Sequence, residues 1–330
     1  MKDRPVLGLI VPAYNEEAVL GNSIARLGSV LEDLNRIGKI SGHSYVCIVD
    51  DGSSDDTWQI ICRSSLENPW VRGIRLSRNF GHQNALMAGM ETCMADVYIS
   101  IDADLQDDET TIAEMIQAYG NGSQVVYGIR RSRDTDSALK RFSALSFYRI
   151  MNVFKTGVIY NHADFRLLSR RAVLEIGRFR EVNLFLRAII PLIGLKTSTV
   201  YYDRKERLAG ETKYSLGTML AFAWEGITSF STIPLRFVSV LGMSIFLLTV
   251  MGAAYSVYQK LFGHVVPGWT STVLPIFFIG GIQLLCVGVL GEYIGKIYQE
   301  VKGRPRYIVE EQRNFNKDFE TRTARPEEQV

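Results

Sequence analysis

The stretch that decides the fold is VYISIDADLQ, residues 97–106. Its first five residues, Val97–Ile101, are mostly apolar and predict a buried strand, and the carboxylates of Asp102 and Asp104 follow directly at the end of that strand. Ligands of open α/β sheets bind outside the carboxyl ends of the parallel strands. We therefore expect Asp102–Gln106 to lie at a binding site.

The flanking sequence repeats a pattern of buried strand and amphipathic helix. Apolar runs predict further strands over residues 6–11, 45–49, 71–76 and 125–128. One helix is indicated by the apolar stripe Leu20, Ile24, Leu27, Leu31 and Leu34. A second is expected to begin near Thr57 with Asp55 as its cap, and a third spans Gln83–Cys93. Strands that alternate with helices predict an α/β fold with a doubly wound, mostly parallel sheet.

Two other predicted strands also end in polar clusters. Tyr14–Glu16 follows the first strand, and Asp50–Asp51 follows the second. Tyr14 can flank a nucleobase, and the carboxylates can accept hydrogen bonds from a base or a ribose. Purely structural roles stay open for both clusters, because a glutamate is favoured at a helix start and an aspartate often caps a helix.

The spacing of Asp102 and Asp104 can direct both carboxylates towards one divalent cation. Mg²⁺ and Mn²⁺ prefer oxygen ligands and commonly bridge to substrate phosphates. We expect Asp104 to contact the metal directly, with Gln106 as an oxygen ligand and Asp102 bonded to ribose or to metal-bound water. A solvated loop without a metal is the alternative, since such carboxylate pairs are common in loops.

Composition excludes several classes of protein. The 330 residues carry a formal net charge of +2, which gives no reason to expect nucleic-acid binding. The four cysteines are scattered, so neither zinc nor a disulfide framework is expected. The hydrophobic content of 47% is unevenly distributed along the chain. Residues 1–215 have the pattern of a soluble domain, whereas residues 234–300 are much more apolar.

Two uncharged stretches predict a membrane anchor. Phe237–Tyr258 and Trp269–Gly291 are each about 22 residues long and can each cross a hydrocarbon core of about 30 Å. The short loop between them predicts a helical hairpin, and the basic residues that flank it place both termini in the cytoplasm. Two buried core helices are the alternative. Residues 216–233 are expected to form an amphipathic interfacial helix, and residues 301–330 a cytosolic tail that is disordered after Val309.

Several other charged residues each allow two interpretations. Arg207 and Lys213 flank a glycine, which suits a loop that closes over a diphosphate, although a solvated juxtamembrane segment would look the same. Arg130 begins a basic cluster that either meets a lipid phosphate or attracts anionic headgroups. Asp164 and Arg166 are expected after the core sheet, either as a structural ion pair or with the carboxylate near an acceptor.

Together these segments resemble the family 2 glycosyltransferases of the GT-A fold. The resemblance is strongest to the polyprenyl-phosphate glycosyltransferases, such as dolichyl-phosphate mannose synthase and the bactoprenol glucosyltransferases of O-antigen (lipopolysaccharide) modification. It runs through about residues 5–308 and rests on VPAYNEE, VDDGSSDDT, LSRNFGHQNAL, IDADLQD, ADFRLLSRRAV, RLAGETKYS, EGITSFSTIPLR and LGEYIGKIYQEVKGRPRY. The QxxRW signature of processive synthases is absent, which argues against cellulose-like polymerisation.

The resemblance implies a GT-A catalytic domain over residues 1–215 and a role for each matching position. The nucleotide-sugar would be bound by Pro12, Ala13, Tyr14, Glu16, Asp50, Asp51, Asp102, Ala103 and Arg130. Asp102, Asp104 and Gln106 would hold Mg²⁺ or Mn²⁺. Arg207 and Lys213 would close on the diphosphate, and Asp164 matches the acid proposed as catalytic base.

The expected activity is the inverting transfer of a hexose onto undecaprenyl phosphate or another polyprenyl phosphate. Glucose from UDP-glucose is suggested by the resemblance alone. The expected location is the cytoplasmic face of the bacterial inner membrane, as a multi-pass protein in contact with lipids. Glycines of the hairpin suggest a homo-oligomer. The alternatives are the same transfer with mannose or a modified aminosugar, a catalytically idle nucleotide-sugar-binding scaffold, and a lipid-linked sugar flippase.

Overall fold

The computed structural model describes residues 4–131, 162–181, 184–203, 233–262 and 269–315. The chain divides into two compact units. One contains all the described strands and includes the segment that starts at Arg304, and the other contains the two long helices. Arg207 and Lys213 lie outside the described residues, as does most of the predicted interfacial helix.

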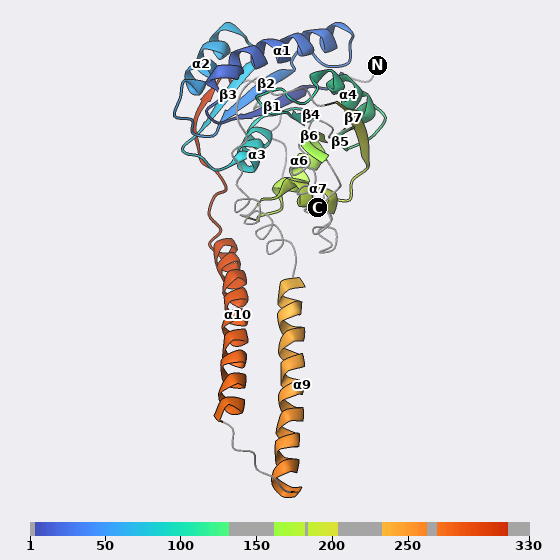
Figure 1. The fold of residues 1–330 in the computed structure, drawn as a ribbon. Helices are drawn as coiled ribbons and strands as arrows, with labels where there is room; N and C mark the ends of the chain where they lie inside the picture. The colour runs from blue at the N-terminus through green and yellow to red at the C-terminus, as the bar shows by residue number, and fades with distance from the viewer. Residues whose placement is uncertain (1–3, 132–161, 182–183, 204–232, 263–268, 316–330) are drawn as a thin grey trace, which may run out of the picture. The chain divides into compact units, whose positions relative to one another are not determined.

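An eight-stranded sheet forms the centre of the first unit (Figure 1), in the order β7-β5-β6-β4-β1-β2-β3-β8. The strands are β1 (Leu7–Ala13), β2 (Tyr45–Asp50), β3 (Val71–Leu76), β4 (Val97–Ser100), β5 (Val125–Arg130), β6 (His162–Ser169), β7 (Thr197–Tyr202) and β8 (Val309–Arg313). Among these described strands, only β6 and β8 run against the common direction. The predicted α/β fold with a mostly parallel sheet is confirmed.

Helices cover both faces of this sheet. One face packs against α1 (Glu17–Arg36), α2 (Thr57–Glu67) and α4 (Ile112–Gly120), the last preceded by the short 3₁₀ helix η1 (Glu109–Thr111). The other face packs against α3 (His82–Thr92), α6 (Arg170–Gly177) and α7 (Leu186–Leu192). Every residue of β1 and β2 is therefore buried, as expected for strands covered on both sides.

The predicted strands and helices of the first half of the chain are confirmed. The five predicted strands correspond to β1–β5, and the three predicted helices to α1–α3. The stripe of α1 that includes Leu20 and Leu27 is buried against the sheet. At the start of α2 the Thr57 N–H donates to Asp55 Oδ1 at 3.0 Å, although the N-cap position itself is occupied by Asp56 and not by the predicted Asp55.

Two predictions about the rest of the sheet are wrong. Asp164 and Arg166 do not follow the core sheet, because β6 lies inside it between β4 and β5. The charged pair interrupts the apolar pattern of β6, yet Arg166 is only 1% exposed because Asp164 pairs with it. The tail is not disordered directly after Val309, because β8 pairs with the edge of β3.

The second unit contains α9 (Ile233–Phe262) and α10 (Trp269–Val301). Within the described residues, one helical segment, Phe278–Val301, is long and apolar enough to cross a membrane, and Phe237–Gly252 is a shorter apolar segment. Large apolar side chains are exposed on both helices, for example Leu247 and Leu284. The structure thus contains one candidate span, and the hairpin of two spans stays a prediction.

Candidate active site

The site begins where the order of the sheet reverses. From β1 the chain winds outward through β2 and β3, and β4 then pairs with the opposite side of β1. The switch point therefore lies between β1 and β4, and crevices at such points bind ligands in α/β proteins. Tyr14 follows the carboxyl end of β1, and the loop Asp102–Gln106 follows that of β4.

The backbone of this loop holds its two carboxylates outward. Leu105 has a φ of 46°, an uncommon conformation for a residue other than glycine. Its N–H donates to the Asp102 carbonyl at 3.1 Å, and its side chain is buried in the core. Asp102 and Asp104 stay partly exposed, while the Gln106 N–H donates to Asp104 Oδ1 at 3.2 Å. The buried leucine thus anchors the loop, and the two carboxylates beside it stay partly exposed at the carboxyl end of β4.

Negative charge is concentrated at Asp102. Withdrawal from water raises the pKa of Asp102 to about 6, and the neighbouring carboxylates of Asp107, Asp164 and Asp104 add to this rise, while His82 opposes it. A bound cation would relieve this repulsion. Among the described residues no group of three or more His, Cys, Asp and Glu side chains could hold a metal ion. A cation at Asp102 and Asp104 would therefore need further ligands from outside this set of side chains.

Arg130 is held by a carboxylate that directly follows the loop. Asp107 Oδ1 accepts from Arg130 Nη2 at 3.2 Å and from the Tyr202 hydroxyl at 2.6 Å. Burial would lower the pKa of Arg130, but Asp107 and Tyr202 outweigh this effect and raise it. The pairing joins β5 and β7 to the acidic loop and leaves 22% of the Arg130 side chain exposed towards the site.

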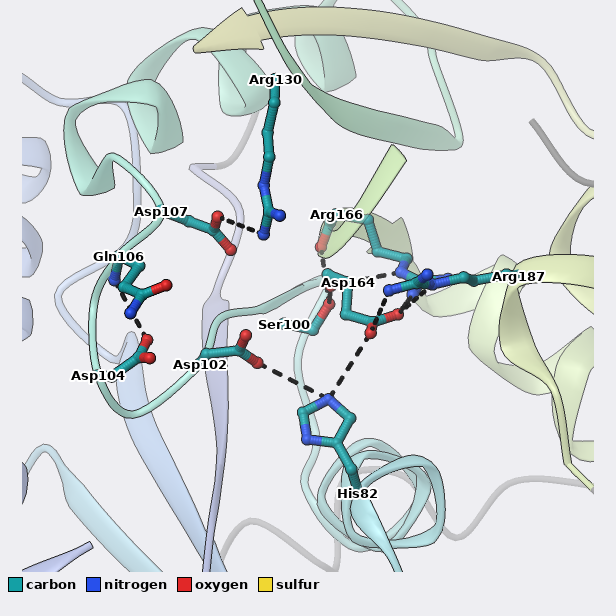
Figure 2. Close-up of polar contacts among 10 residues, drawn as sticks. All are labelled: His82, Ser100, Asp102, Asp104, Gln106, Asp107, Arg130, Asp164, Arg166 and Arg187. Carbon is teal, nitrogen blue, oxygen red and sulfur yellow. Dashed lines mark hydrogen bonds and ion pairs between the residues drawn. The ribbon is translucent and has the colours of Figure 1, made fainter. Parts of the chain in front are cut away.

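Asp164 lies between two arginines (Figure 2). Its Oδ1 pairs with Arg166 Nη2 and accepts from Arg187 Nε at 3.3 Å, and its Oδ2 accepts from Arg187 Nη2 at 2.9 Å. Burial alone would raise the pKa of Asp164, but the two guanidinium groups outweigh burial and hold this pKa well below its usual value. Asp164 is consequently ionised and a weak proton acceptor.

His82 connects the acidic loop with this arginine cluster. It is the first residue of α3, and its Nε2 lies 3.7 Å from Asp102 Oδ1 and 4.0 Å from Asp164 Oδ2. Figure 2 shows the imidazole directed towards the two carboxylates. Its side chain is 41% exposed, so it can also meet a ligand.

The two carboxylates at the end of β2, Asp50 and Asp51, have partners within the protein. Asp51 accepts from the N–H groups of Phe80 and Gly81 at 2.7 and 2.9 Å, and thereby fixes the turn before α3. Asp50 is completely buried, and its Oδ1 accepts from the Ser53 N–H at 3.0 Å. Both residues shape the loops of the site, and burial raises the pKa of each carboxyl group.

The turn after β1 offers one exposed ring. The Tyr14 side chain is 47% exposed, while the next two N–H groups are held by side chains of the neighbouring turn: Asn15 donates to Ser53 Oγ and Glu16 to Thr57 Oγ1, both at 2.9 Å. Pro12, Ala13 and Ala103 are buried. These three residues can therefore reach a ligand only through the backbone.

The structure brings Asp102, Asp104, Arg130 and Asp164 close together. Of these four residues, the sequence predicts only Asp102 and Asp104 at a strand end. Sequence reasoning missed four residues of this cluster: His82, Asp107, Arg187 and Tyr202. The segment that contains His82 was part of the family resemblance, and Asp107 adjoins the DADLQ loop, so a signal existed for both. No local pattern marks Arg187 or Tyr202, which reach the site only through the fold.

Comparison with known proteins shows to which class of protein the chain belongs. The family described as Glycosyl transferase family 2 matches residues 9–177. The chain belongs to this family and is a glycosyltransferase. It is 48% identical to the "Uncharacterized glycosyltransferase YkoT" of Bacillus subtilis over 94% of this chain and 92% of that protein.

Other relatives have a more specific name, bactoprenol glucosyl transferase. The SfII prophage-derived bactoprenol glucosyl transferase of Shigella flexneri is 38% identical over 94% of this chain and 99% of the relative. Among solved structures, glucosyl-3-phosphoglycerate synthase from Mycobacterium tuberculosis aligns with a TM-score of 0.47 and 17% identity, and covers 69% of this chain and 80% of that one.

Proposed function

We propose that the chain is an inverting glycosyltransferase that moves glucose from UDP-glucose onto undecaprenyl phosphate or a similar polyprenyl phosphate. The observation that carries this proposal is the similarity, along nearly the whole chain, to relatives named bactoprenol glucosyl transferase. The acidic loop after β4 supports it, because its carboxylates could hold a divalent cation that would offset the negative charge of the donor's diphosphate. The product would be a lipid-linked sugar for modification of the cell envelope.

The reaction is a displacement at the anomeric carbon. An oxygen of the lipid phosphate forms a bond to this carbon while the bond from the carbon to the diphosphate breaks, and the electron pair leaves with UDP. Configuration at the carbon inverts. Since the second pKa of a phosphate monoester is about 6, the attacking oxygen carries no proton near neutral pH. Positioning and electrostatic stabilisation then contribute more than a general base.

The acidic loop would hold the metal. Asp104 is proposed as the direct ligand of Mg²⁺ or Mn²⁺, with Gln106 and Asp102 completing the protein's share. When bound, such a cation compensates the charge that develops on the leaving diphosphate. Arg207 and Lys213 lie outside the described residues, and their closure over the diphosphate remains proposed from the resemblance.

The donor nucleotide is assigned to the crevice after β1 and β2. Tyr14 would flank the base, while Glu16 and Arg130 would contribute polar contacts. Because Pro12, Ala13 and Ala103 are buried, they would contribute through the backbone. Asp50 and Asp51 would act by shaping the loops, since Asp50 is completely buried and both oxygens of Asp51 already accept backbone N–H groups.

We further propose that α9 and α10 form a membrane hairpin with both ends in the cytoplasm. β8, which follows α10, pairs with β3 of the catalytic sheet. If α10 crosses a membrane, the preceding chain must cross as well for both ends to belong to one domain, and α9 is the apolar helix available. Open space around Gly280, Gly288 and Gly291 would allow close approach of another helix and supports a homo-oligomer.

Two alternatives are tested by the same experiment: the transfer of mannose or an aminosugar, and an idle binding scaffold. The full-length protein is incubated with undecaprenyl phosphate, Mg²⁺ or Mn²⁺ and a panel of nucleotide-sugars, and the lipids are analysed by mass spectrometry. We expect a metal-dependent product with UDP-glucose that is lost in Asp104→Asn. Asp33→Asn, an exposed carboxylate on α1, is the matched control and should keep full activity. A product from another donor would reassign the sugar, and binding of UDP without any product would support the scaffold.

A further inference from the structure

We propose that Arg187 binds the phosphate of the lipid acceptor, and that Asp164 positions Arg187 instead of accepting a proton. This inference rests on the proposed function, because it assigns a binding residue to the acceptor of that reaction. The similarity to other proteins gives no role to the Arg187 side chain, and the role proposed for Asp164 replaces that of the catalytic base that the resemblance implies.

The charges of the site are divided between two sides. Asp102 and Asp104 form the acidic side, where a cation fits. On the other side Asp164 faces the guanidinium groups of both Arg166 and Arg187, so these three side chains together carry one net positive charge. His82 Nε2 lies between the two sides, 3.7 Å from Asp102 and 4.0 Å from Asp164. An anionic acceptor is therefore attracted to the arginine side.

The geometry at Asp164 argues against a role as a base. Its Oδ1 faces Arg166 and Arg187, and its Oδ2 accepts from Arg187 Nη2 at 2.9 Å. Charged N–H donors on both oxygens favour the ionised carboxylate and make it a weaker proton acceptor. The proposed acceptor, a phosphate dianion, has no proton to give near neutral pH.

Of the two arginines, Arg187 is the one that can meet a substrate. Arg166 is 1% exposed and closed off from solvent, whereas 30% of the Arg187 side chain is exposed. Arg187 lies at the start of α7, whose neighbouring residues Leu186 and Ile189 are buried in the core. The planar guanidinium group is suited to phosphate oxygens, and Asp164 fixes its direction through two hydrogen bonds.

The test separates binding of the acceptor from chemistry. Acceptor KM and kcat are measured for Arg187→Gln, Arg187→Lys and Asp164→Asn with undecaprenyl phosphate and UDP-glucose, and UDP affinity is measured by calorimetry. We expect Arg187→Gln to raise the acceptor KM by about tenfold or more, the cost of roughly one charged hydrogen-bond pair, with unchanged UDP affinity and partial rescue in Arg187→Lys. Arg178→Gln changes an exposed arginine that directly follows α6 and pairs with Glu175; it is the matched control and should behave like the wild type.

Asp164→Asn distinguishes a positioning carboxylate from a base. If Asp164 acts through Arg187, Asp164→Asn raises the acceptor KM, and the protein that carries both Asp164→Asn and Arg187→Gln has the same acceptor KM as Arg187→Gln alone. The pH profile of kcat keeps its shape. An unchanged acceptor KM in Arg187→Gln overturns the inference. So does a fall in kcat of more than about a hundredfold in Asp164→Asn together with loss of the acidic limb of the pH profile.

Failure of the inference can be told from failure of the proposed function. A wild-type protein that transfers no sugar to undecaprenyl phosphate would contradict the function itself, whereas normal transfer with unaffected Arg187 variants would contradict only the inference. Folding is monitored through UDP affinity. Arg187→Gln leaves the pair of Asp164 and the buried Arg166 balanced in charge, so we expect this variant to fold, and Arg187→Lys provides a second, charge-preserving variant.

Discussion

Single side chains hold the loops of the site by accepting backbone N–H groups. Asp51 accepts from Phe80 and Gly81 with its two oxygens, at 2.7 and 2.9 Å. Asp51→Asn replaces one acceptor oxygen by a donor and leaves one of these N–H groups unpaired, at a cost of about 1–3 kcal/mol. We expect a lower melting temperature and weaker UDP binding, measured by thermal unfolding and calorimetry. Equal stability of Asp51→Asn and the surface control Asp33→Asn would contradict this assignment.

Gly52 allows the turn after β2 to approach the chain before α3. It has a φ of 71°, and a Cβ atom built on it would lie 2.5 Å from the carbonyl carbon of Arg78. Gly52→Ala should therefore combine conformational strain with a backbone clash. At Gly81 the φ is 93° but a Cβ atom would meet nothing within 4 Å, so Gly81→Ala should cost only the backbone strain, about 1–3 kcal/mol. Thermal unfolding should show the larger loss for Gly52→Ala, and the reverse order would refute the argument.

The lowered pKa of Asp164 predicts how stability depends on pH. An unfolded aspartate has a pKa of about 3.9, and the folded value lies below it because Arg166 and Arg187 overcome the effect of burial. The unfolded chain therefore binds this proton first as the pH falls, so the stabilisation is present above about pH 4 and is lost below it. We expect Asp164→Asn to be less stable than the wild type at pH 6, and the difference in melting temperature to narrow by pH 3.5. If the difference in melting temperature is the same at pH 6 and pH 3.5, Asp164 contributes to stability through its packing and not through its charge.

At the scale of elements, β8 completes the catalytic sheet. Its pairing with β3 is reinforced by side chains, since Trp58 Nε1 donates to Glu311 at 3.2 Å and the Asn314 amide donates to the Val71 carbonyl at 2.7 Å. A chain shortened after Phe315 keeps these contacts, whereas one shortened after Gly303 exposes the edge of β3 to aggregation. Size-exclusion chromatography in detergent should show a monodisperse peak for the first and aggregates for the second. Similar behaviour of both chains would show that β8 is dispensable.

Elements with a regular apolar pattern could be predicted, and those with buried or edge-exposed charge could not. β1–β5 and α1–α3 have the expected apolar patterns, and their parallel arrangement places the carboxylates after β4 at the switch point. β6 contains Asp164 and Arg166, whose burial depends on each other and on Arg187. β8 is the polar sequence VEEQR and is stable only because β3 offers it an edge. The acidic loop was thus predictable, whereas the arginine cluster depends on contacts distant in sequence.

At the scale of the whole molecule, the expected arrangement in the membrane follows from the position of β8, where the chain rejoins the catalytic sheet after the two long helices. β8 belongs to the same sheet as β7, and α9 and α10 lie between these strands in the sequence. If the two helices cross a membrane, the loop around His264 lies on the far side and β8 stays on the side of the catalytic domain.

Labelling of bacterial spheroplasts with a membrane-impermeant maleimide tests this arrangement. One variant carries His264→Cys and another carries Gln312→Cys on β8, both with Cys62 and Cys286 changed to serine, since the other two cysteines are buried. We expect His264→Cys to react in spheroplasts and Gln312→Cys, which is exposed on the protein, only after the membrane is opened with detergent. The reason is that the chain has to cross twice to bring β8 back to β3. If neither cysteine reacts before detergent is added while the protein still sediments with membranes, the helices lie on the cytoplasmic surface, and the hairpin proposal is wrong although the sheet is unaffected.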